Sequence, residues 1–153
     1  MMNLSCNVLK ALCGKTLATA ESCTGGGIGA ALTAIPGSSA VYKGGIISYS
    51  NEVKCDQLGV DPLILDREGA VSAPVAEQMA SGGRERLQTD VCVSVTGLAG
   101  PDGDEYGNPV GTVYIGYADS KCCVSRKFYF AGDRDQVRRQ AIEKALEFIL
   151  EFV

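Results

Sequence analysis

The chain has 153 residues, which is the usual size of one domain, and 46% of them are hydrophobic while 21% are charged. The formal net charge of −4 argues against the broad basic surface that nucleic acid binding requires. No apolar run approaches the roughly 20 residues that span a bilayer, and the N-terminus lacks the basic region of a signal peptide. We therefore expect one domain over residues 1–153, located in the cytoplasm, without nucleic acid or membrane partners.

Seven cysteines and no histidine limit the chemistry that the chain can perform. None of the cysteines forms a C-x-x-C pair, so we expect reduced thiols, no metal site and no cofactor. Ser-His-Asp and Cys-His arrangements need a histidine, which this chain cannot supply. A nucleophile here would therefore need another base, and lysine is the obvious candidate.

In the first half of the chain, hydrophobic spacing and turn residues predict alternating helices and strands. The expected elements are a helix over 3–13, a strand over 16–20, a helix over 28–35, a strand over 44–49 and a helix over 51–58. Residues 61–71 are expected to be irregular, with one helical turn after Pro62.

In the second half, the pattern predicts a helix, three strands and a final helix. The expected elements are a helix over 72–87, a strand over 91–95, a hairpin of strands over 110–118 and 122–130, and a helix from Asp133 to residue 150. The pair Gly82-Gly83 is expected to weaken the middle of the first of these helices. Strands mixed with helices indicate an α/β fold whose sheet is covered on both faces.

The stretch TAESCTGGG, residues 19–27, lies where a strand passes into a helix. Its glycines would leave N–H groups free at the helix start, which suits an anion, although it does not match a P-loop. A tight strand-to-helix turn explains the stretch equally well. Cys23 is expected to be a packed neighbour, because a cysteine nucleophile needs a base and a lowered pKa.

The stretch PGSSAVYKGGIISYSNEVK, residues 36–54, brings two serines and a lysine into a short segment. A serine can attack a carbonyl carbon if a nearby lysine is neutral enough to take its proton, and burial lowers the pKa of a lysine. Alternatively, Ser38 and Ser39 are turn residues and Lys54 is a solvated charge on a helix.

Two later segments also carry candidate site residues. In VTGLAGPDG, residues 95–103, Thr96 leaves the end of a strand into a glycine-rich loop, the place where open α/β sheets bind ligands. In AGDRDQVRR, residues 131–139, Arg134 is expected in the first turn of the last helix, where the helix dipole disfavours a cation. Binding of a phosphate or carboxylate would explain an arginine at this position. The simpler alternatives are a flexible surface turn for residues 95–103 and an exposed arginine for Arg134.

Together with the GAVS turn at 69–72 and the PVGTV segment, these four motifs resemble the CinA C-terminal domain family over about residues 8–150. Stand-alone members of this family are known as PncC, nicotinamide-nucleotide amidohydrolases. The resemblance implies a three-layer α/β/α sandwich with a mixed sheet and no metal. It also implies hydrolysis of the carboxamide of nicotinamide mononucleotide to nicotinate mononucleotide and ammonia, by a serine and a lysine.

The resemblance also implies roles for individual residues. Ser39 would be the nucleophile and Lys54 the base, with Tyr49 and Thr96 in the catalytic site. Whether Ser38 or Ser39 attacks, and whether Ser22 only orients the substrate, stays open. The residues expected to bind substrate or shape the pocket are Ser22, Gly25, Gly26, Ser38, Asn51, Gly97 and Arg134. Backbone N–H groups at Gly37–Ser39 or at Gly25 would stabilise the oxyanion.

A function of a different class remains open alongside the amidohydrolase. The domain could be a non-catalytic nucleotide-binding or protein-interaction module linked to competence or DNA damage, which would bind without releasing ammonia. A homodimer or larger homo-oligomer is expected, because the ending LEFILEFV has more apolar residues than one buried face needs.

Overall fold

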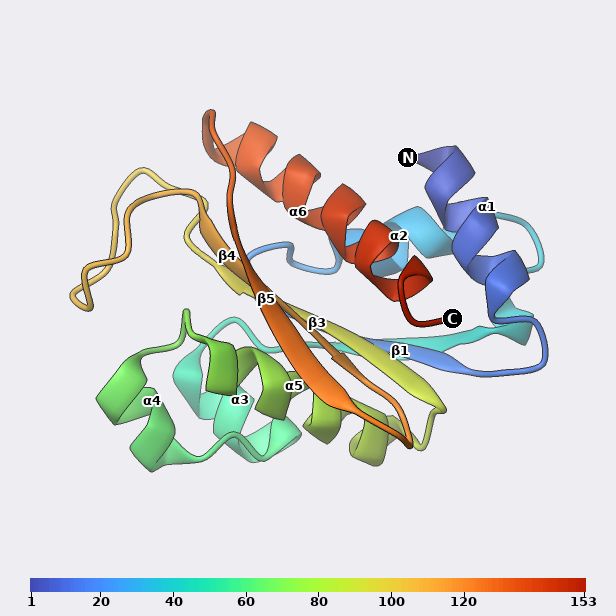
Figure 1. Cartoon of the computed structure of the whole chain (residues 1–153), viewed down its shortest axis with the longest axis horizontal. Coiled ribbons are helices and arrows are strands. Elements are labelled where there is room, and N and C mark those ends of the chain that lie inside the picture. Colours follow the sequence, from blue (N-terminus) through green and yellow to red (C-terminus); the bar gives the residue numbers. More distant parts are fainter.

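The computed structural model describes residues 1–153 and contains one five-stranded sheet with six α-helices (Figure 1). In chain order the elements are α1 (Met2–Ala11), β1 (Leu17–Glu21), α2 (Gly27–Thr33), a short 3-10 helix (Ser38–Ala40), β2 (Tyr42–Ile47), α3 (Asn51–Leu58), α4 (Pro62–Glu68), α5 (Ala73–Leu87), β3 (Val91–Gly97), β4 (Thr112–Ala118), β5 (Cys123–Tyr129) and α6 (Arg134–Leu150).

The sheet is mixed, with the strand order β2-β1-β3-β4-β5. β1 pairs in parallel with β2 on one side and with β3 on the other, while β3 with β4 and β4 with β5 are antiparallel. The carboxyl ends of β1, β2, β3 and β5 therefore reach the same edge of the sheet. The chain crosses from one side of β1 to the other, and such a switch point is where open α/β sheets bind ligands.

Helices cover both faces of the sheet, as expected, in a three-layer α/β/α sandwich. Figure 1 shows α1, α2 and α6 on one face and α3, α4 and α5 on the other. The larger core lies beneath α1, α2 and α6, and the smaller core lies beneath α3, α4 and α5. β1 and β3 are buried along almost their whole length, which is typical of strands covered on both faces.

One helix was not expected from the sequence. Residues 62–68 form α4 because Asp61 caps it, accepting a hydrogen bond from the Leu63 N–H at 2.9 Å, and Pro62 occupies its first position. The apolar residues of this short helix are too few to show a clear period, so the sequence indicated only a single turn.

The expected weakness at Gly82-Gly83 is not seen, because α5 runs unbroken through both residues. At Gly82, a Cβ atom would lie 1.8 Å from the carbonyl oxygen of Leu58, at the end of α3. The glycine therefore lets two helices pack backbone against backbone, and it does not mark a break.

The apolar end of α6 is covered within the chain. Phe148 and Ile149 are buried, and Phe152 stacks on Tyr117 with ring centroids 4.4 Å apart. Phe152 and Val153 stay exposed after the helix, so the core covers only part of this apolar ending, and the oligomeric state stays a prediction. No helix combines the length and the apolar character needed to cross a membrane.

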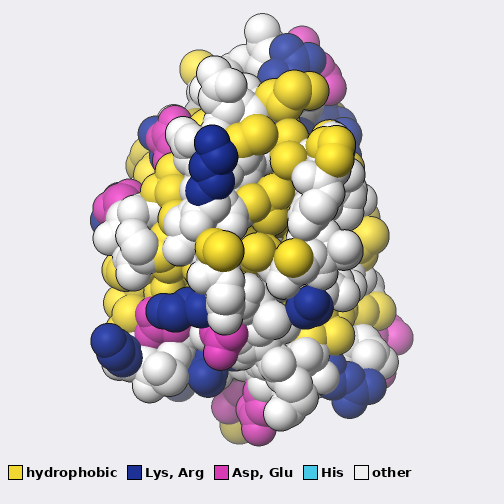
Figure 2. Space-filling view, turned by 90° about the vertical axis from the view of Figure 1, so that its right-hand side faces the viewer, with side chains coloured by type: hydrophobic (Ala, Val, Ile, Leu, Met, Phe, Trp, Pro, Cys, Tyr) yellow, Lys and Arg dark blue, Asp and Glu magenta, His cyan; other side chains and the backbone are white.

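Figure 2 views the end of the molecule that carries α1, where hydrophobic side chains gather around a groove. Cys6 and Leu9 of α1, with Cys13 just after the helix, form one wall of this groove, and residues 35–37 with Ala40 and Val41 form the other. The groove lies at the edge of the sheet where β1 and β2 begin, because it borders the segment that leads into β2.

Candidate active site

A cavity of about 290 Å³ opens at the edge where the parallel strands end. This volume is near the lower limit for small-molecule sites. Its walls come from the residues that follow β1, β2 and β3, from the turn before α5 and from the start of α6. The lining residues are Ser22, Cys23, Tyr49, Asn51, Lys54, Ala70, Val71, Thr96, Gly97, Leu98, Ala99, Gly100, Asp102 and Arg134.

Lys54 points into this cavity from the first turns of α3, and only 1% of the residue is exposed. Ser50 begins the helix by accepting a hydrogen bond from the Val53 N–H, which fixes the helix start. The burial of Lys54 lowers the pKa of its side chain to about 8, since desolvation penalises the charged form. No carboxylate forms an ion pair with it.

Three oxygen atoms surround the side-chain nitrogen of Lys54, one for each of its two hydrogens and its lone pair in the neutral form. Nζ lies 2.8 Å from the carbonyl oxygen of Ser48, 3.3 Å from that of Tyr49 and 3.1 Å from the hydroxyl oxygen of Ser22. A carbonyl can only accept, so the two carbonyls hold two N–H groups of the lysine. In the neutral amine the lone pair is then directed at the Ser22 hydroxyl, which is the arrangement of a base poised to take a proton.

Ser22 follows directly after β1, and its hydroxyl is the only serine hydroxyl that contacts Lys54. The next peptide offers a donor beside it. The Cys23 N–H donates to no acceptor within the protein, and Cys23 lines the same cavity. A free N–H on the residue after a serine nucleophile is a common oxyanion donor.

The structure separates Ser39 from Lys54 and so contradicts their expected pairing. Ser39 lies in the 3-10 helix before β2, next to Tyr42, which is paired with the start of β1, whereas Lys54 follows the end of β2. At about 3.3 Å per residue, β2 alone separates these two ends by roughly 16 Å. Ser38 is buried beside Ser39 and does not line the cavity, so neither serine nor the N–H groups around Gly37 belong to the site.

The expected anion site at the start of α2 is also corrected. The carboxylate of Glu21 already occupies this helix start, accepting hydrogen bonds from the N–H groups of Ile28 at 2.8 Å and Gly29 at 3.1 Å. Gly25 and Gly26 have left-handed backbone conformations and lead into α2, but they do not line the cavity. The two glycines shape the turn that carries Ser22. The anion at the helix start is the Glu21 carboxylate, so the start is not free to bind a ligand.

Thr96, Asn51 and Gly97 line the cavity as predicted. Thr96 is buried at the end of β3 and donates its hydroxyl hydrogen to the carbonyl of Ala70 at 2.9 Å. This bond joins the floor of the cavity to the turn before α5. The predicted residues are thus brought together from three strand ends and the start of α6, with the exception of Ser38, Ser39 and the two glycines.

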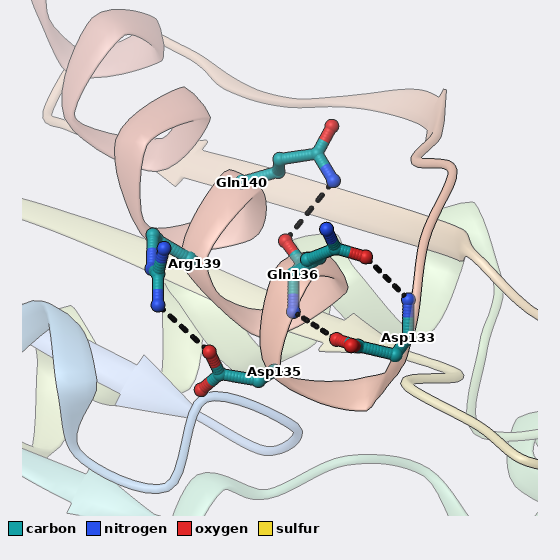
Figure 3. Close-up of polar contacts among 5 residues, drawn as sticks. All are labelled: Asp133, Asp135, Gln136, Arg139 and Gln140. Atoms are coloured by element: carbon teal, nitrogen blue, oxygen red, sulfur yellow. Dashed lines mark hydrogen bonds and ion pairs between the residues drawn. The ribbon is translucent and has the colours of Figure 1, made fainter.

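Arg134 and Tyr49 form the exposed rim of the cavity. The guanidinium of Arg134 donates to the carbonyl of Gly100 and, at 3.1 Å, to the hydroxyl of Tyr49. Arg134 is the first residue of α6, and it reaches the rim because Asp133 and Gln136 close the helix start with a reciprocal capping box (Figure 3). The rim therefore presents an arginine at the mouth of the pocket.

Cys23 lines the cavity, but its thiol has little nucleophilic character. Its burial raises its pKa to about 11, so almost none of it is thiolate at neutral pH. All seven cysteines are free thiols. No group of three or more Cys, Asp or Glu side chains has the geometry to hold a metal ion.

Several residues of the site were missed from the sequence. Ala70, Val71, Leu98, Ala99 and Asp102 line the cavity, and the glycine-rich stretch around 97–103 was the signal that could have found most of them. Glu21 and Arg138 were missed because they do not line the cavity and instead contact the turn that follows Ser22. Arg138 donates to the carbonyls of Cys23 at 3.0 Å and Thr24 at 3.2 Å.

Comparison with known proteins agrees with this architecture. The model of the CinA C-terminal domain matches residues 3–153. The chain belongs to the CinA C-terminal domain family. A CinA-like protein of Thermosynechococcus vestitus is 53% identical over 138 residues, which are 88% of this chain and 33% of that protein. A putative competence-damage inducible protein of Halothermothrix orenii is 50% identical over 92% of this chain and 34% of its own length.

Solved structures of the CinA superfamily share the whole fold. A competence-damaged protein (CinA) superfamily protein from Escherichia coli superposes with a TM-score of 0.97 at 35% identity, covering 99% of this chain and 90% of its own. The competence damage-inducible protein A of Klebsiella pneumoniae gives 0.96 at 36% identity, with 99% and 95% covered. The chain spans about a third of the length of the curated relatives that it matches.

Proposed function

We propose that this CinA domain is an amidohydrolase that converts nicotinamide mononucleotide to nicotinate mononucleotide and ammonia, with Ser22 as nucleophile and Lys54 as base. The observation that carries the proposal is the 3.1 Å contact between Lys54 Nζ and Ser22 Oγ inside a cavity where the lysine pKa is lowered to about 8. The substrate is the one that the family resemblance implies. The same cavity offers the nucleophile, the base and a free N–H donor that amide hydrolysis needs.

In the first half of the reaction, Ser22 Oγ attacks the carboxamide carbon while its proton passes to the neutral amine of Lys54. The negative charge that forms on the carboxamide oxygen is stabilised by the Cys23 N–H. The Lys54 ammonium then donates its proton to the departing nitrogen. The carbon–nitrogen bond breaks, ammonia leaves and an ester on Ser22 remains.

The second half repeats these roles with water. Lys54 takes a proton from a water molecule, which attacks the ester carbon, and then returns the proton to Ser22 Oγ as the ester bond breaks. Nicotinate mononucleotide is released and the dyad is restored. The carbonyls of Ser48 and Tyr49 keep Nζ in place through both halves, because they bind its other two hydrogens.

The nucleotide part of the substrate extends toward the rim. Arg134 is exposed there, and a guanidinium suits a phosphate through paired hydrogen bonds. Arg134 donates hydrogen bonds to Gly100 and Tyr49 and so joins two loops at the mouth of the cavity. These bonds fix the guanidinium before an anion binds to it.

Ammonia release from nicotinamide mononucleotide by the purified domain, with and without EDTA, tests the proposal. We expect activity that survives EDTA, is abolished by Ser22→Ala or Lys54→Met and is retained by Ser39→Ala. A folded protein that binds the nucleotide without releasing ammonia would instead support a non-catalytic binding module.

A further inference from the structure

Glu21 is a buried carboxylate that the proposed reaction does not use. It is 2% exposed, and no cation pairs with it. Its two oxygens accept three hydrogen bonds, from the Thr24 hydroxyl at 2.7 Å and from the N–H groups of Ile28 at 2.8 Å and Gly29 at 3.1 Å. Burying a carboxylate is costly, so a site that keeps one needs compensating donors.

Hydrogen bonds hold the turn that carries Ser22 at both of its ends. The carbonyl of Ser22 accepts from the Gly25 N–H at 3.1 Å, and the carbonyl of Thr24 accepts from the Gly27 N–H at 3.0 Å. Glu21 holds the turn to α2 through the Thr24 hydroxyl. From the opposite side, Arg138 on α6 holds the carbonyls of Cys23 and Thr24.

The restraints on this turn decide where the Cys23 N–H points. In a trans peptide the N–H lies opposite the carbonyl of the same unit. The Ser22 carbonyl is fixed by the Gly25 N–H, so the Cys23 N–H is directed away from that bond. It has no acceptor in the protein, and Cys23 lines the cavity next to the Ser22 hydroxyl.

We propose that Glu21 is a positioning residue, which holds the Ser22–Gly25 turn so that the Cys23 N–H meets the oxyanion formed at Ser22. This inference rests on the proposed function and deepens it. Glu21 does not touch the substrate; it acts through the Thr24 hydroxyl and the start of α2. Loss of an oxyanion donor costs about 10²- to 10³-fold in kcat in serine hydrolases, so a misaligned donor is expected to cost about 10- to 100-fold.

A glutamine cannot replace Glu21, although it has the same shape. A carboxylate is an acceptor at both oxygens, whereas a glutamine amide has one acceptor oxygen and one NH₂ donor. In Glu21→Gln the NH₂ group would face either the Gly29 N–H or the donors from Thr24 and Ile28. One side of the turn then loses its anchor without any loss of volume.

The experiment compares Glu21→Gln with a pair of variants at Thr24 that leave the charge unchanged. Thr24→Val keeps the shape and removes the hydroxyl that donates to Glu21, while Thr24→Ser restores it. Glu77→Gln is the matched control. Glu77 lies on α5, does not line the cavity and accepts a hydrogen bond from the Ser125 hydroxyl at 2.6 Å. Thermal unfolding of every variant is measured alongside.

Two readouts are taken at the high-pH plateau, where Lys54 is neutral. The first is kcat and KM for nicotinamide mononucleotide. The second is the rate at which an alkyl fluorophosphonate modifies Ser22, which needs no nucleotide. In that reaction the Ser22 Oγ–phosphorus bond forms, the phosphorus–fluorine bond breaks, fluoride leaves and the serine proton passes to Lys54. The P=O oxygen takes the place of the oxyanion.

We expect Glu21→Gln and Thr24→Val to lower kcat and the phosphonylation rate about 10-fold or more, with KM nearly unchanged. Thr24→Ser and Glu77→Gln should react like the wild type. Equal rates in folded Glu21→Gln, Thr24→Val and wild-type protein would overturn the positioning role while leaving the proposed function intact. The positioning role would also be overturned if the variants changed only KM, or if Thr24→Ser lowered kcat and the phosphonylation rate as much as Thr24→Val does.

The two proposals fail in different ways. A wild-type protein that is phosphonylated at Ser22 but does not hydrolyse the nucleotide has a different substrate, and the probe rates of the variants still decide the role of Glu21. If the wild type shows neither reaction, Ser22 is not an activated nucleophile, and both proposals are overturned.

Discussion

The amine nitrogen of Lys54 lies 3.1 Å from the hydroxyl oxygen of Ser22, although the two residues are 32 positions apart in the chain. β1 delivers the serine and α3 delivers the lysine to one edge of the sheet. Two carbonyls fix the other hydrogens of the lysine, so its orientation does not depend on the substrate. The pair is therefore organised before any ligand binds, which removes an entropic cost from the reaction.

Substitution of the two candidate serines gives opposite results. We expect Ser22→Ala to lower ammonia release by at least about 10³-fold, because it removes the nucleophile itself. Ser39→Ala should retain full activity, since Ser39 is an exposed residue of the 3-10 helix before β2 and does not line the cavity. Steady-state assays on both variants decide this point. An inactive but folded Ser39→Ala protein would contradict the assignment of Ser22.

The rate should rise with pH through the pKa of Lys54, which is lowered to about 8. Only the neutral amine can take the serine proton, so at pH 7 about a tenth of the molecules are competent, and the rate reaches a plateau above pH 9. A pH series of kcat/KM measures this midpoint. Lys54→Arg should be inactive at every pH, because a guanidinium stays protonated. A rate that falls between pH 7 and 9 would exclude a lysine base.

Substitution of Arg134 should weaken substrate binding more than it slows the chemical step. Arg134→Ala removes the guanidinium at the rim, and a charged hydrogen bond to a phosphate is worth about 1.5 to 3 kcal/mol, so KM should rise about 10- to 100-fold. Arg139→Ala is the matched control, because Arg139 pairs with Asp135 on the same helix at 2.7 Å and does not line the cavity (Figure 3). Equal KM values for both variants would remove Arg134 from substrate binding.

The sequence predicted the layers of the fold and seven of the 14 residues that line the cavity. Periodicity located every strand, and the polar residues after strand ends met at one edge because parallel strands share a direction. Lys54, Tyr49, Thr96 and Arg134 came together in this way. α4 was missed because a seven-residue helix held by one cap and a proline carries little periodic signal.

The predicted pairing of Ser39 with Lys54 does not form, for a physical reason. Ser39 is much closer to Lys54 in sequence than Ser22 is, but β2 runs between Ser39 and Lys54 and carries them to opposite edges. Sequence separation does not measure distance across a strand. Likewise, the start of α2 suited an anion, yet nothing in the pattern indicated that Glu21 would fold back to fill it.

Close packing of α3 on α5 makes Gly82 sensitive to a single methyl group. Helix propensity alone predicts that Gly82→Ala stabilises the protein by up to about 1 kcal/mol. The added Cβ would lie 1.8 Å from the Leu58 carbonyl oxygen, so we expect destabilisation of about 1–3 kcal/mol instead, and a lower Tm. Ser81→Ala, at the exposed neighbour on the same helix, is the control. A raised Tm for Gly82→Ala would show that the two helices can separate freely.

The lowered pKa of Lys54 should also appear in the pH dependence of folding. An unfolded lysine titrates near 10.4, so between pH 8 and 10.5 the unfolded chain binds a proton that the folded protein has released. Stability therefore rises with pH across this window, by about 3 kcal/mol for a shift of this size. The buried thiols of Cys23 and Cys92 act in the opposite sense, since their raised pKa values lower stability as the unfolded thiols ionise.

Comparison of the wild type with Lys54→Met isolates the lysine from those thiols. Denaturant unfolding of both proteins at several pH values gives the difference in their free energies of unfolding. The contribution of Cys92 cancels from this difference, and Cys23 contributes only through its coupling to the Lys54 charge. That difference should move in favour of the wild type as the pH rises from 8 to 10.5 and stay flat between pH 6 and 7. A difference that does not change with pH would mean that Lys54 keeps an ordinary pKa in the folded state, and a lysine base would then lose its physical support.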